Sequence, residues 1–244
     1  MKKRSRVGRL ARFVLRGGRR RVGPADAPAH RPSHVLFDFD GTLADTFEAG
    51  REVLNELAVE FGFRPLEEAE VAVARDFSTR ELMRHLGVPR LRLPAISSRG
   101  AAKMRDRMAG IQPFPGIREM LLRLRAGDFR LGIVTSNSEE NVQIFLKAQD
   151  LGSFDFIESS SKLLGKASVL RRVLCERKLG RDRVFFVGDE LRDIEAAHEV
   201  GIPIAAVAWG FNSERVLRAA QPCLCFQQPA AVADFLTRLP LSPC

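Results

Sequence analysis

The chain has 244 residues, of which 45% are hydrophobic and 28% charged, as in an ordinary soluble globular protein. This length allows one large domain, or one domain with an insertion. No run of about 18 apolar residues occurs, so we expect no membrane-spanning helix.

The positive net charge is concentrated at the N-terminus. The chain carries a formal net charge of +9, and residues 1–34 hold eleven Lys and Arg residues against one acid, Asp26. The remaining residues are close to neutral. The charge therefore argues against a nucleic-acid-binding domain in the main part of the chain.

Residues 1–33 are rich in basic residues and contain little apolar mass, so we predict that they form a basic tail. Gly17 and Gly18 would end any short helix, and three prolines follow before residue 34. We expect a disordered extension, or extra residues translated from an upstream start codon. Two alternatives remain open: contact with anionic lipid or nucleic acid, and an organelle transit peptide.

Four cysteines give little sign of a metal site. Cys223 and Cys225 form a C-x-C pair, but no second pair or histidine cluster accompanies it, whereas zinc usually takes four ligands at recognisable spacings. We therefore expect free thiols in a reducing compartment, and a cytoplasmic protein.

The first predicted strand ends in two acidic residues. The apolar run 34–37 is followed by Asp38, Asp40, Gly41 and Thr42. Because side chains alternate along a strand, Asp38 and Asp40 are expected to start on the same side. Two carboxylates at close range raise each other's pKa, and a divalent cation would relieve the repulsion and create a site for a phosphate.

A helix-rich stretch follows, over about residues 46–110. Apolar residues at helical spacing predict a helix over 47–62. Ser78 and Glu81 form a capping-box pattern at the start of a second helix, which Gly87 would end. A third helix is predicted from Ser98 to Ala109. No strand pattern interrupts this stretch.

From residue 113 onward, helices and strands alternate. Nearly continuous apolar strands between helices predict a parallel sheet covered on both faces, a doubly wound α/β core with a helical insertion after its first strand. The predicted strands are 129–138, 154–159, 183–190, 203–210 and 223–226, and the predicted helices are 116–127, 139–150, 166–180, 191–201, 212–220 and 230–239.

Polar residues gather where these strands end, at the edge where open parallel sheets bind ligands. Thr135 ends one strand, and its hydroxyl can hold a phosphate together with the backbone N–H groups of the following helix. Asp189 ends another strand, and Asp193 lies one helical turn later. Clustered acids of this kind suit Mg²⁺, which prefers oxygen ligands.

These segments, in this order, resemble the four motifs of the haloacid dehalogenase-like hydrolases, specifically the D-x-D-G-T form found in phosphatases. The resemblance covers residues 34 to about 238. It implies a Rossmann-like core with a helical cap, as in the phosphoglycolate phosphatase-like branch. The implied domains are the tail at 1–33, the core at 34–45 with 113–240, and the cap at 46–112.

The same resemblance implies a lysine near the start of a helix. Lys166 follows Gly165 and precedes a predicted helix, and Lys162 is the competing choice. A cation is needed there to offset a nucleophilic aspartate and the phosphoryl oxygens. We predict that Lys166 is this residue.

The implied mechanism assigns a role to each of these residues. Asp38 would be the nucleophile and Asp40 the general acid and base. Mg²⁺ would be held by Asp38, the backbone carbonyl of Asp40, and Asp189. Thr135, Ser136 and Lys166 would bind the phosphate, with contacts from Asn137 as an option. Supporting roles would fall to Thr42, Glu190 and Asp193.

The expected substrate is a small phosphorylated metabolite, phosphoglycolate-like or a sugar phosphate. Asp40 favours phosphoester chemistry, because dehalogenating relatives lack this acid. Arg75, Arg80 and Arg84 of the cap could contact an anionic leaving group. Two alternatives remain: a phosphomutase of the same fold, and a non-catalytic protein that binds through its basic tail. The oligomeric state is not predicted.

Overall fold

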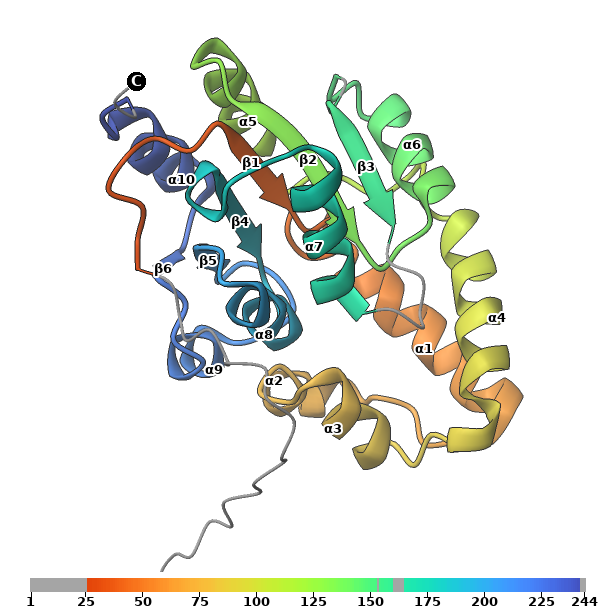
Figure 1. Ribbon diagram of the computed structural model, residues 1–244. Coiled ribbons are helices and arrows are strands. Elements are labelled where there is room, and N and C mark those ends of the chain that lie inside the picture. Colours follow the sequence, from red (N-terminus) through yellow and green to blue (C-terminus); the bar gives the residue numbers. More distant parts are fainter. Residues whose placement is uncertain (1–25, 153, 160–164, 242–244) are drawn as a thin grey trace, which may run out of the picture.

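The computed structural model describes residues 26–152, 154–159 and 165–241 (Figure 1). Its centre is a parallel sheet of six strands in the order β3-β2-β1-β4-β5-β6. The doubly wound α/β core predicted from the sequence is therefore confirmed. The strands are β1 (His34–Phe37), β2 (Arg130–Thr135), β3 (Phe156–Ser159), β4 (Val184–Gly188), β5 (Ile204–Val207) and β6 (Leu224–Phe226).

The first strand lies in the middle of the sheet. Phe37, its last residue, pairs with Ile133 of β2 on one side and with Val187 of β4 on the other. The three strands thus end close to the same line. The residues that follow β1 and β4, and the last residue of β2, are brought together at one edge of the sheet.

Alternation along the strands supplies apolar side chains to both faces of the sheet. In β1, Val35 and Phe37 belong to one core, and Leu36 belongs to the other. The first core is closed by α5 (Ile117–Ala126), α6 (Glu139–Ala148) and α10 (Pro229–Arg238), and the second by α7 (Gly165–Glu176), α8 (Leu191–Val200) and α9 (Glu214–Ala219).

Between β1 and β2 the chain forms the predicted helical insertion. It has its own apolar core, which includes Val53, Leu57, Leu86 and Ile96. In Figure 1, α1 and α4 run together, and α2 and α3 lie below the carboxyl edge of the sheet. The helices are α1 (Phe47–Phe61), α2 (Val71–Ala74), α3 (Thr79–His85) and α4 (Leu93–Arg105), with short 3₁₀ helices at Glu68–Glu70 and Arg90–Arg92.

Local sequence signals set most helix ends in the insertion. At the start of α3, the backbone N–H of Glu81 donates to Ser78 Oγ, and the backbone N–H of Ser78 donates to Glu81 Oε2, which confirms the capping box. The helix predicted from Ser98 to Ala109 was misplaced. The helix begins at Leu93 and ends at Arg105. Its start is compatible with Pro94, which lies in the first turn, where no intrahelical N–H is required.

The insertion enters and leaves the core at one place. The backbone N–H of Asp45 donates to the carbonyl of Gln112 at 2.9 Å, and Ala44 forms a β-bridge with Pro113. The assignment of 46–112 as a separate cap remains a prediction. Among the described residues, no helix is long and apolar enough to cross a membrane.

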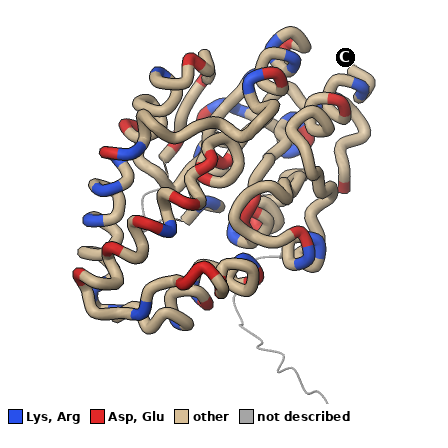
Figure 2. The backbone as a smooth tube through the Cα atoms, turned by 180° about the vertical axis from the view of Figure 1, so that it is seen from behind, with Lys and Arg blue, Asp and Glu red and all other residues tan. Residues whose placement is uncertain are grey.

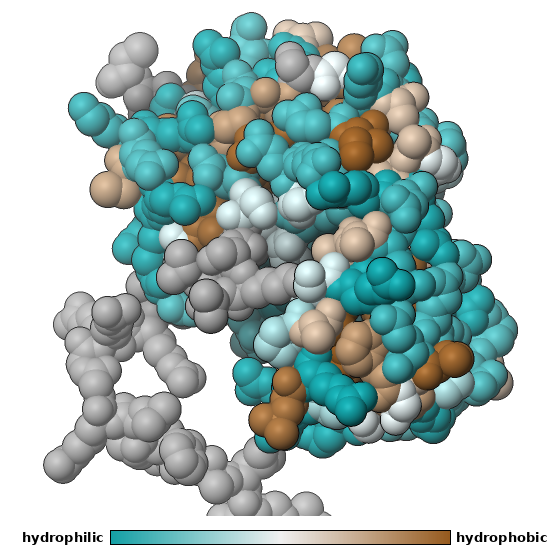
Figure 3. All heavy atoms as spheres, turned by 90° about the vertical axis from the view of Figure 1, so that its right-hand side faces the viewer, coloured by the Kyte–Doolittle hydropathy of each residue, from teal (hydrophilic) through white to brown (hydrophobic). Residues whose placement is uncertain are grey.

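The surface of the described residues is mixed in charge. Figure 2 shows Lys and Arg interspersed with Asp and Glu along the tube. On the side drawn in Figure 3, the visible hydrophobic groups lie in small spots between hydrophilic ones. Single exposed apolar side chains such as Val59 and Leu91 are normal for protein surfaces.

Candidate active site

Asp38 is the first residue beyond β1, and it is buried. By alternation it lies on the Leu36 side of the sheet, which α7 and α8 cover. Its Oδ1 accepts a hydrogen bond from the backbone N–H of Phe39 at 2.7 Å, and its Oδ2 lies 2.8 Å from the ammonium nitrogen of Lys166. The end of the central strand thus presents a fixed carboxylate beside a cation.

Two further carboxylates complete a cluster with Asp38. Carboxylate oxygens of Asp38, Asp189 and Asp193 all lie within 4.8 Å of one another, and all three residues are buried. Asp189 is held in place because the Thr42 hydroxyl donates to its Oδ1 and the backbone N–H of Phe211 donates to its Oδ2, both at 2.7 Å. Thr42 therefore holds one oxygen of this carboxylate in place.

Lys166 is the buried cation of this cluster. It lies in the first turn of α7 and forms ion pairs with Asp38 and with Asp193. Burial alone would lower its pKa, but the carboxylates of Asp193 and Asp38 raise the pKa above the usual lysine value. Lys166 is therefore a fixed positive charge. The competing candidate, Lys162, lies outside the described residues.

The protein cations balance these acids only in part. Burial, followed by the charge of Asp193, raises the pKa of Asp38 to about 7, and burial and Asp38 raise the pKa of Asp189 well above its usual range. Asp38 Oδ2 is buried, and although Lys166 lies 2.8 Å away as an ion-pair partner, no donor meets hydrogen-bond geometry at this oxygen. The negative charge of the cluster is only partly neutralised by protein cations. Its clustered carboxylate oxygens therefore suit a hard divalent cation such as Mg²⁺.

Two glycines allow the loops to approach Asp189 closely. Gly41 has φ +75°, and a Cβ at this position would lie 2.2 Å from Asp189 Oδ2. A Cβ on Gly210 would lie 2.3 Å from the Asp189 side chain. A side chain at either position would displace a carboxylate of the cluster. This explains why glycine follows the second aspartate of the first motif.

Asp40 has different surroundings from Asp38. The strand ends at Phe37 and Gly41 has φ +75°, so strand alternation does not extend to Asp40. Both oxygens of Asp40 accept hydrogen bonds from the Asn137 amide nitrogen, each at 3.1 Å. Burial raises the pKa of Asp40, and the Asn137 bond lowers it in part.

The segment after β2 lies beside both aspartates. Thr135 is buried at the end of the strand, and its hydroxyl accepts a hydrogen bond from the backbone N–H of Asn137 at 3.0 Å. Ser136 lines a cavity together with Asp40 and Asn137. Sequence reasoning treated Asn137 as a possible phosphate contact, whereas the structure shows that it holds Asp40.

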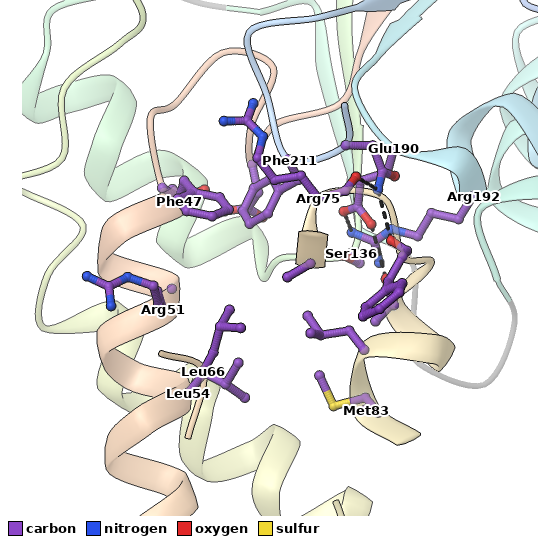
Figure 4. A pocket seen from close by; sticks show the side chains of 18 of the residues that line it. Phe47, Arg51, Leu54, Leu66, Arg75, Met83, Ser136, Glu190, Arg192 and Phe211 are labelled. Carbon is purple, nitrogen blue, oxygen red and sulfur yellow. Dashed lines mark hydrogen bonds and ion pairs between the residues drawn. The ribbon is translucent and has the colours of Figure 1, made fainter. Parts of the chain in front are cut away.

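The cavity lies between the carboxyl edge of the sheet and the insertion, with a volume of about 390 Å³ (Figure 4). Of the three cap arginines predicted to contact substrate, Arg75 lines this cavity, and its guanidinium donates to the carbonyl of Gly210. Arg80 lines a smaller neighbouring pocket, and Arg84 lines neither.

Three residues near the site were not singled out from the sequence. Arg192 pairs with Glu190 and lines the cavity, Phe211 binds Asp189 through its backbone, and Asn212 bonds the insertion to the core. Arg192 lies between Asp189 and Asp193, and the other two follow β5. The general rule that ligands bind beyond the ends of parallel strands could have drawn attention to both segments.

Comparison with known proteins agrees with this geometry. Residues 35–207 match the family model described as haloacid dehalogenase-like hydrolase. A phosphoglycolate phosphatase of Synechococcus elongatus is 34% identical over 84% of this chain and 97% of its own length. A second phosphoglycolate phosphatase, from Rhodospirillum rubrum, is 27% identical over 84% of this chain and 91% of its own length.

Solved structures share the same fold. A predicted phosphatase from Clostridium acetobutylicum has a TM-score of 0.75 and 22% identity, and the alignment covers 86% of this chain and all of that one. At this level of identity the likeness shows the fold alone, and the family rests on the sequence matches. The chain therefore belongs to the haloacid dehalogenase-like hydrolases and is a phosphatase of that family.

Proposed function

We propose that this enzyme hydrolyses a small phosphorylated metabolite, with phosphoglycolate or a sugar phosphate as first candidates, through a phosphoryl group carried on Asp38. One observation supports this most directly. Two aspartates two residues apart have different partners, Lys166 for Asp38 and Asn137 for Asp40. Paired acids in unlike environments are typical of a division between nucleophile and proton donor.

In the first step, a carboxylate oxygen of Asp38 attacks phosphorus, and the bond between phosphorus and the ester oxygen breaks. The leaving oxygen takes the proton of Asp40, whose position on the cavity wall suits this role. The products are an aspartyl-phosphate and a free alcohol. The raised pKa of Asp40 favours the protonated form that this step needs.

In the second step, Asp40, now ionised, accepts a proton from a water molecule that attacks the phosphorus of the aspartyl-phosphate. The bond between phosphorus and Asp38 breaks, and inorganic phosphate leaves. Asp38 is released as a carboxylate and Asp40 is protonated again. Both residues return to their starting state.

The remaining residues hold and neutralise the phosphoryl group. Lys166 supplies a positive charge, and the polar groups of Thr135 and Ser136 supply donors at the end of β2. Asp193 orients Lys166 through their ion pair. Mg²⁺ would be held by Asp38, Asp189 and the backbone carbonyl of Asp40, and when bound it would neutralise charge between the nucleophile and the phosphate.

Phosphate release from a panel of small phosphoesters, with Mg²⁺ and with a chelator, tests this proposal. Asp38→Asn is expected to lower kcat by roughly 10³-fold or more, because the amide is not a nucleophile. The denatured wild-type enzyme, quenched during turnover, should carry one phosphoryl group on Asp38. No release from any ester would refute the hydrolase. Formation of an isomer without release of phosphate would support a phosphomutase. Function retained in Asp38→Asn would support a binding protein that acts through its tail.

A further inference from the structure

The cavity beside Asp40 has two chemically distinct ends. At the catalytic end, Asp40, Ser136 and Asn137 offer polar groups. The opposite end is walled by apolar side chains from four parts of the insertion, namely α1, the segment after it, α3 and α4: Leu54, Leu66, Leu82, Met83, Ala101 and Met104. Figure 4 shows Leu54 and Leu66 facing Met83 across this space. Whatever occupies this end is surrounded mainly by hydrocarbon.

Aromatic rings also line the cavity. Phe47 at the start of α1 and Phe211 after β5 pack with ring centroids 5.5 Å apart, and both line the cavity. Phe77, on the loop before α3, also lines it. Rings of this kind add apolar surface to a ligand's path from the phosphoryl site into the insertion.

The arginines of the cavity wall all have partners. Arg51 pairs with Glu48 at 2.8 Å and Glu68 at 3.1 Å, and in Figure 4 it points away from the space between Leu54 and Met83. Arg192 pairs with Glu190.

Arg75 lies over the Phe47 ring, with 5.5 Å from its guanidinium carbon to the ring centroid, and donates to a backbone carbonyl. Among the described residues that line the apolar end, there is no cation to receive a second acidic group. A carboxylate placed there would lose its hydration without gaining a partner, which is costly.

We propose that the preferred substrate is a phosphate monoester whose alcohol carries an extended apolar group, which fills the space between α1, α3 and α4. This inference rests on the proposed phosphatase activity and keeps its chemistry at Asp38, but it names an apolar ester as the preferred substrate in place of phosphoglycolate or a sugar phosphate. The cavity volume of about 390 Å³ lies in the range of pockets for drug-sized ligands and exceeds what the two-carbon glycolate unit fills. Burial of apolar surface would provide the binding energy.

An alkyl series tests this proposal. Ethyl, butyl and hexyl phosphate release alcohols of nearly equal acidity, so differences in kcat/KM report burial of the chain rather than leaving-group chemistry. Each methylene should raise kcat/KM by up to about fourfold, and hexyl phosphate should exceed ethyl phosphate by at least about tenfold. Hexyl phosphate should also exceed phosphoglycolate.

A matched pair of variants locates the alkyl chain. Ala101 and Ala102 are neighbours on α4 and both are exposed, but only Ala101 lines the cavity. Ala101→Phe should lower kcat/KM for hexyl phosphate about tenfold and change that for ethyl phosphate less than about twofold. Ala102→Phe should leave both unchanged, and thermal unfolding of each variant checks that it is folded.

The outcomes separate this inference from the proposed function. Phosphate release with no dependence on chain length, or with phosphoglycolate preferred to hexyl phosphate, would overturn the apolar substrate and leave the phosphatase standing. An equal loss for both alkyl esters in Ala101→Phe would likewise overturn the placement of the chain. Absence of release from every ester would refute the phosphatase, and the inference with it.

Discussion

At the scale of single residues, the site derives its chemistry from the different surroundings of Asp38 and Asp40. Asp38 is buried in a cluster with Asp189, Asp193 and Lys166, and the three carboxylates could hold a metal ion. Asp40 faces the cavity and is bonded to Asn137. The family resemblance predicted Lys166 as the cation beside Asp38, but not the bond between Asn137 and Asp40. Asn137 lies 97 positions away and contacts Asp40 only through the folding of β1 beside β2.

Replacing Asn137 should change the proton affinity of Asp40. The Asn137 bond lowers the pKa of Asp40, so Asn137→Ala should raise it. The limb of the kcat–pH profile that reports Asp40 should therefore move to higher pH. Ser138→Ala is the control, because Ser138 caps α6 without touching Asp40. An unmoved limb in Asn137→Ala would contradict the role given to Asp40.

Without metal, stability should fall as the pH rises. The pKa of Asp38 is about 7 in the folded state and about 4 in an unfolded chain, so between these values the folded state binds more protons. Stability from this group is complete below about pH 4 and is lost as the pH rises through about 7.

Urea denaturation in a chelator, between pH 5 and 8, measures this loss. Mg²⁺ should restore stability at the upper end by binding the ionised cluster. Asp38→Asn should flatten the dependence, although Asp189, whose pKa is also raised, retains part of it. A free energy of unfolding that rises steadily across this range would show that the carboxylates are not coupled as described.

At the scale of elements, the loop after β5 joins the insertion to the core. The Asn212 amide nitrogen donates to the carbonyls of Arg75 and Phe77, both at 2.9 Å, and its carbonyl oxygen accepts from the backbone N–H of Leu191 at 2.9 Å. The backbone N–H of Ser213 also donates to the carbonyl of Arg75. One buried side chain thus connects the insertion, α8 and the end of the sheet.

Asn212→Asp should loosen this connection selectively. The carboxylate still accepts from Leu191 but cannot donate to the two carbonyls, so the free energy of unfolding should fall by about 2 kcal/mol. Amides of residues 75–79 should exchange with solvent faster. Asn55→Asp makes the same chemical change at bonds inside the insertion, to Leu66, and should leave exchange at 75–79 unchanged. Slow exchange at 75–79 in Asn212→Asp would refute the connecting role.

Helix and strand types were predictable because each is encoded locally. Apolar residues at helical spacing predicted α1, and the capping-box pair Ser78 and Glu81 predicted the start of α3. The apolar run 34–37 also coincides with β1. Contacts across the cavity were not predictable. Arg75 and Gly210 are 135 positions apart, and no local pattern relates them. The role of Asn212 was missed for the same reason.

At the scale of the whole molecule, charge is separated along the chain. The first 26 residues hold ten Lys and Arg, while the rest of the chain is nearly balanced and mixes both signs over its surface (Figure 2). The described part begins at residue 26. The backbone N–H of Arg31 donates to the carbonyl of Pro240 at 2.7 Å, which ties the segment before β1 to the end of α10.

Removal of residues 1–26 should leave catalysis intact. The described site residues make their contacts from residue 38 onward, and physiological salt screens exposed charges beyond about 8 Å. We expect kcat/KM to change by less than about twofold at that salt concentration. A tenfold loss would give the tail a catalytic role. Binding to anionic vesicles and to nucleic acid should be measured for the protein with and without the tail. The comparison tests the two contacts that the sequence left open for the tail.

The place where the insertion enters and leaves the core has an evolutionary consequence. Asp45 and Gln112 are hydrogen-bonded neighbours, so the chain between them begins and ends at one point. A segment of different length or sequence could be exchanged there without altering the register of β1 and β2. Selection could then change which alcohols are accepted while the residues that handle phosphate stay fixed, and chimaeras joined at these two residues offer a route to new specificities.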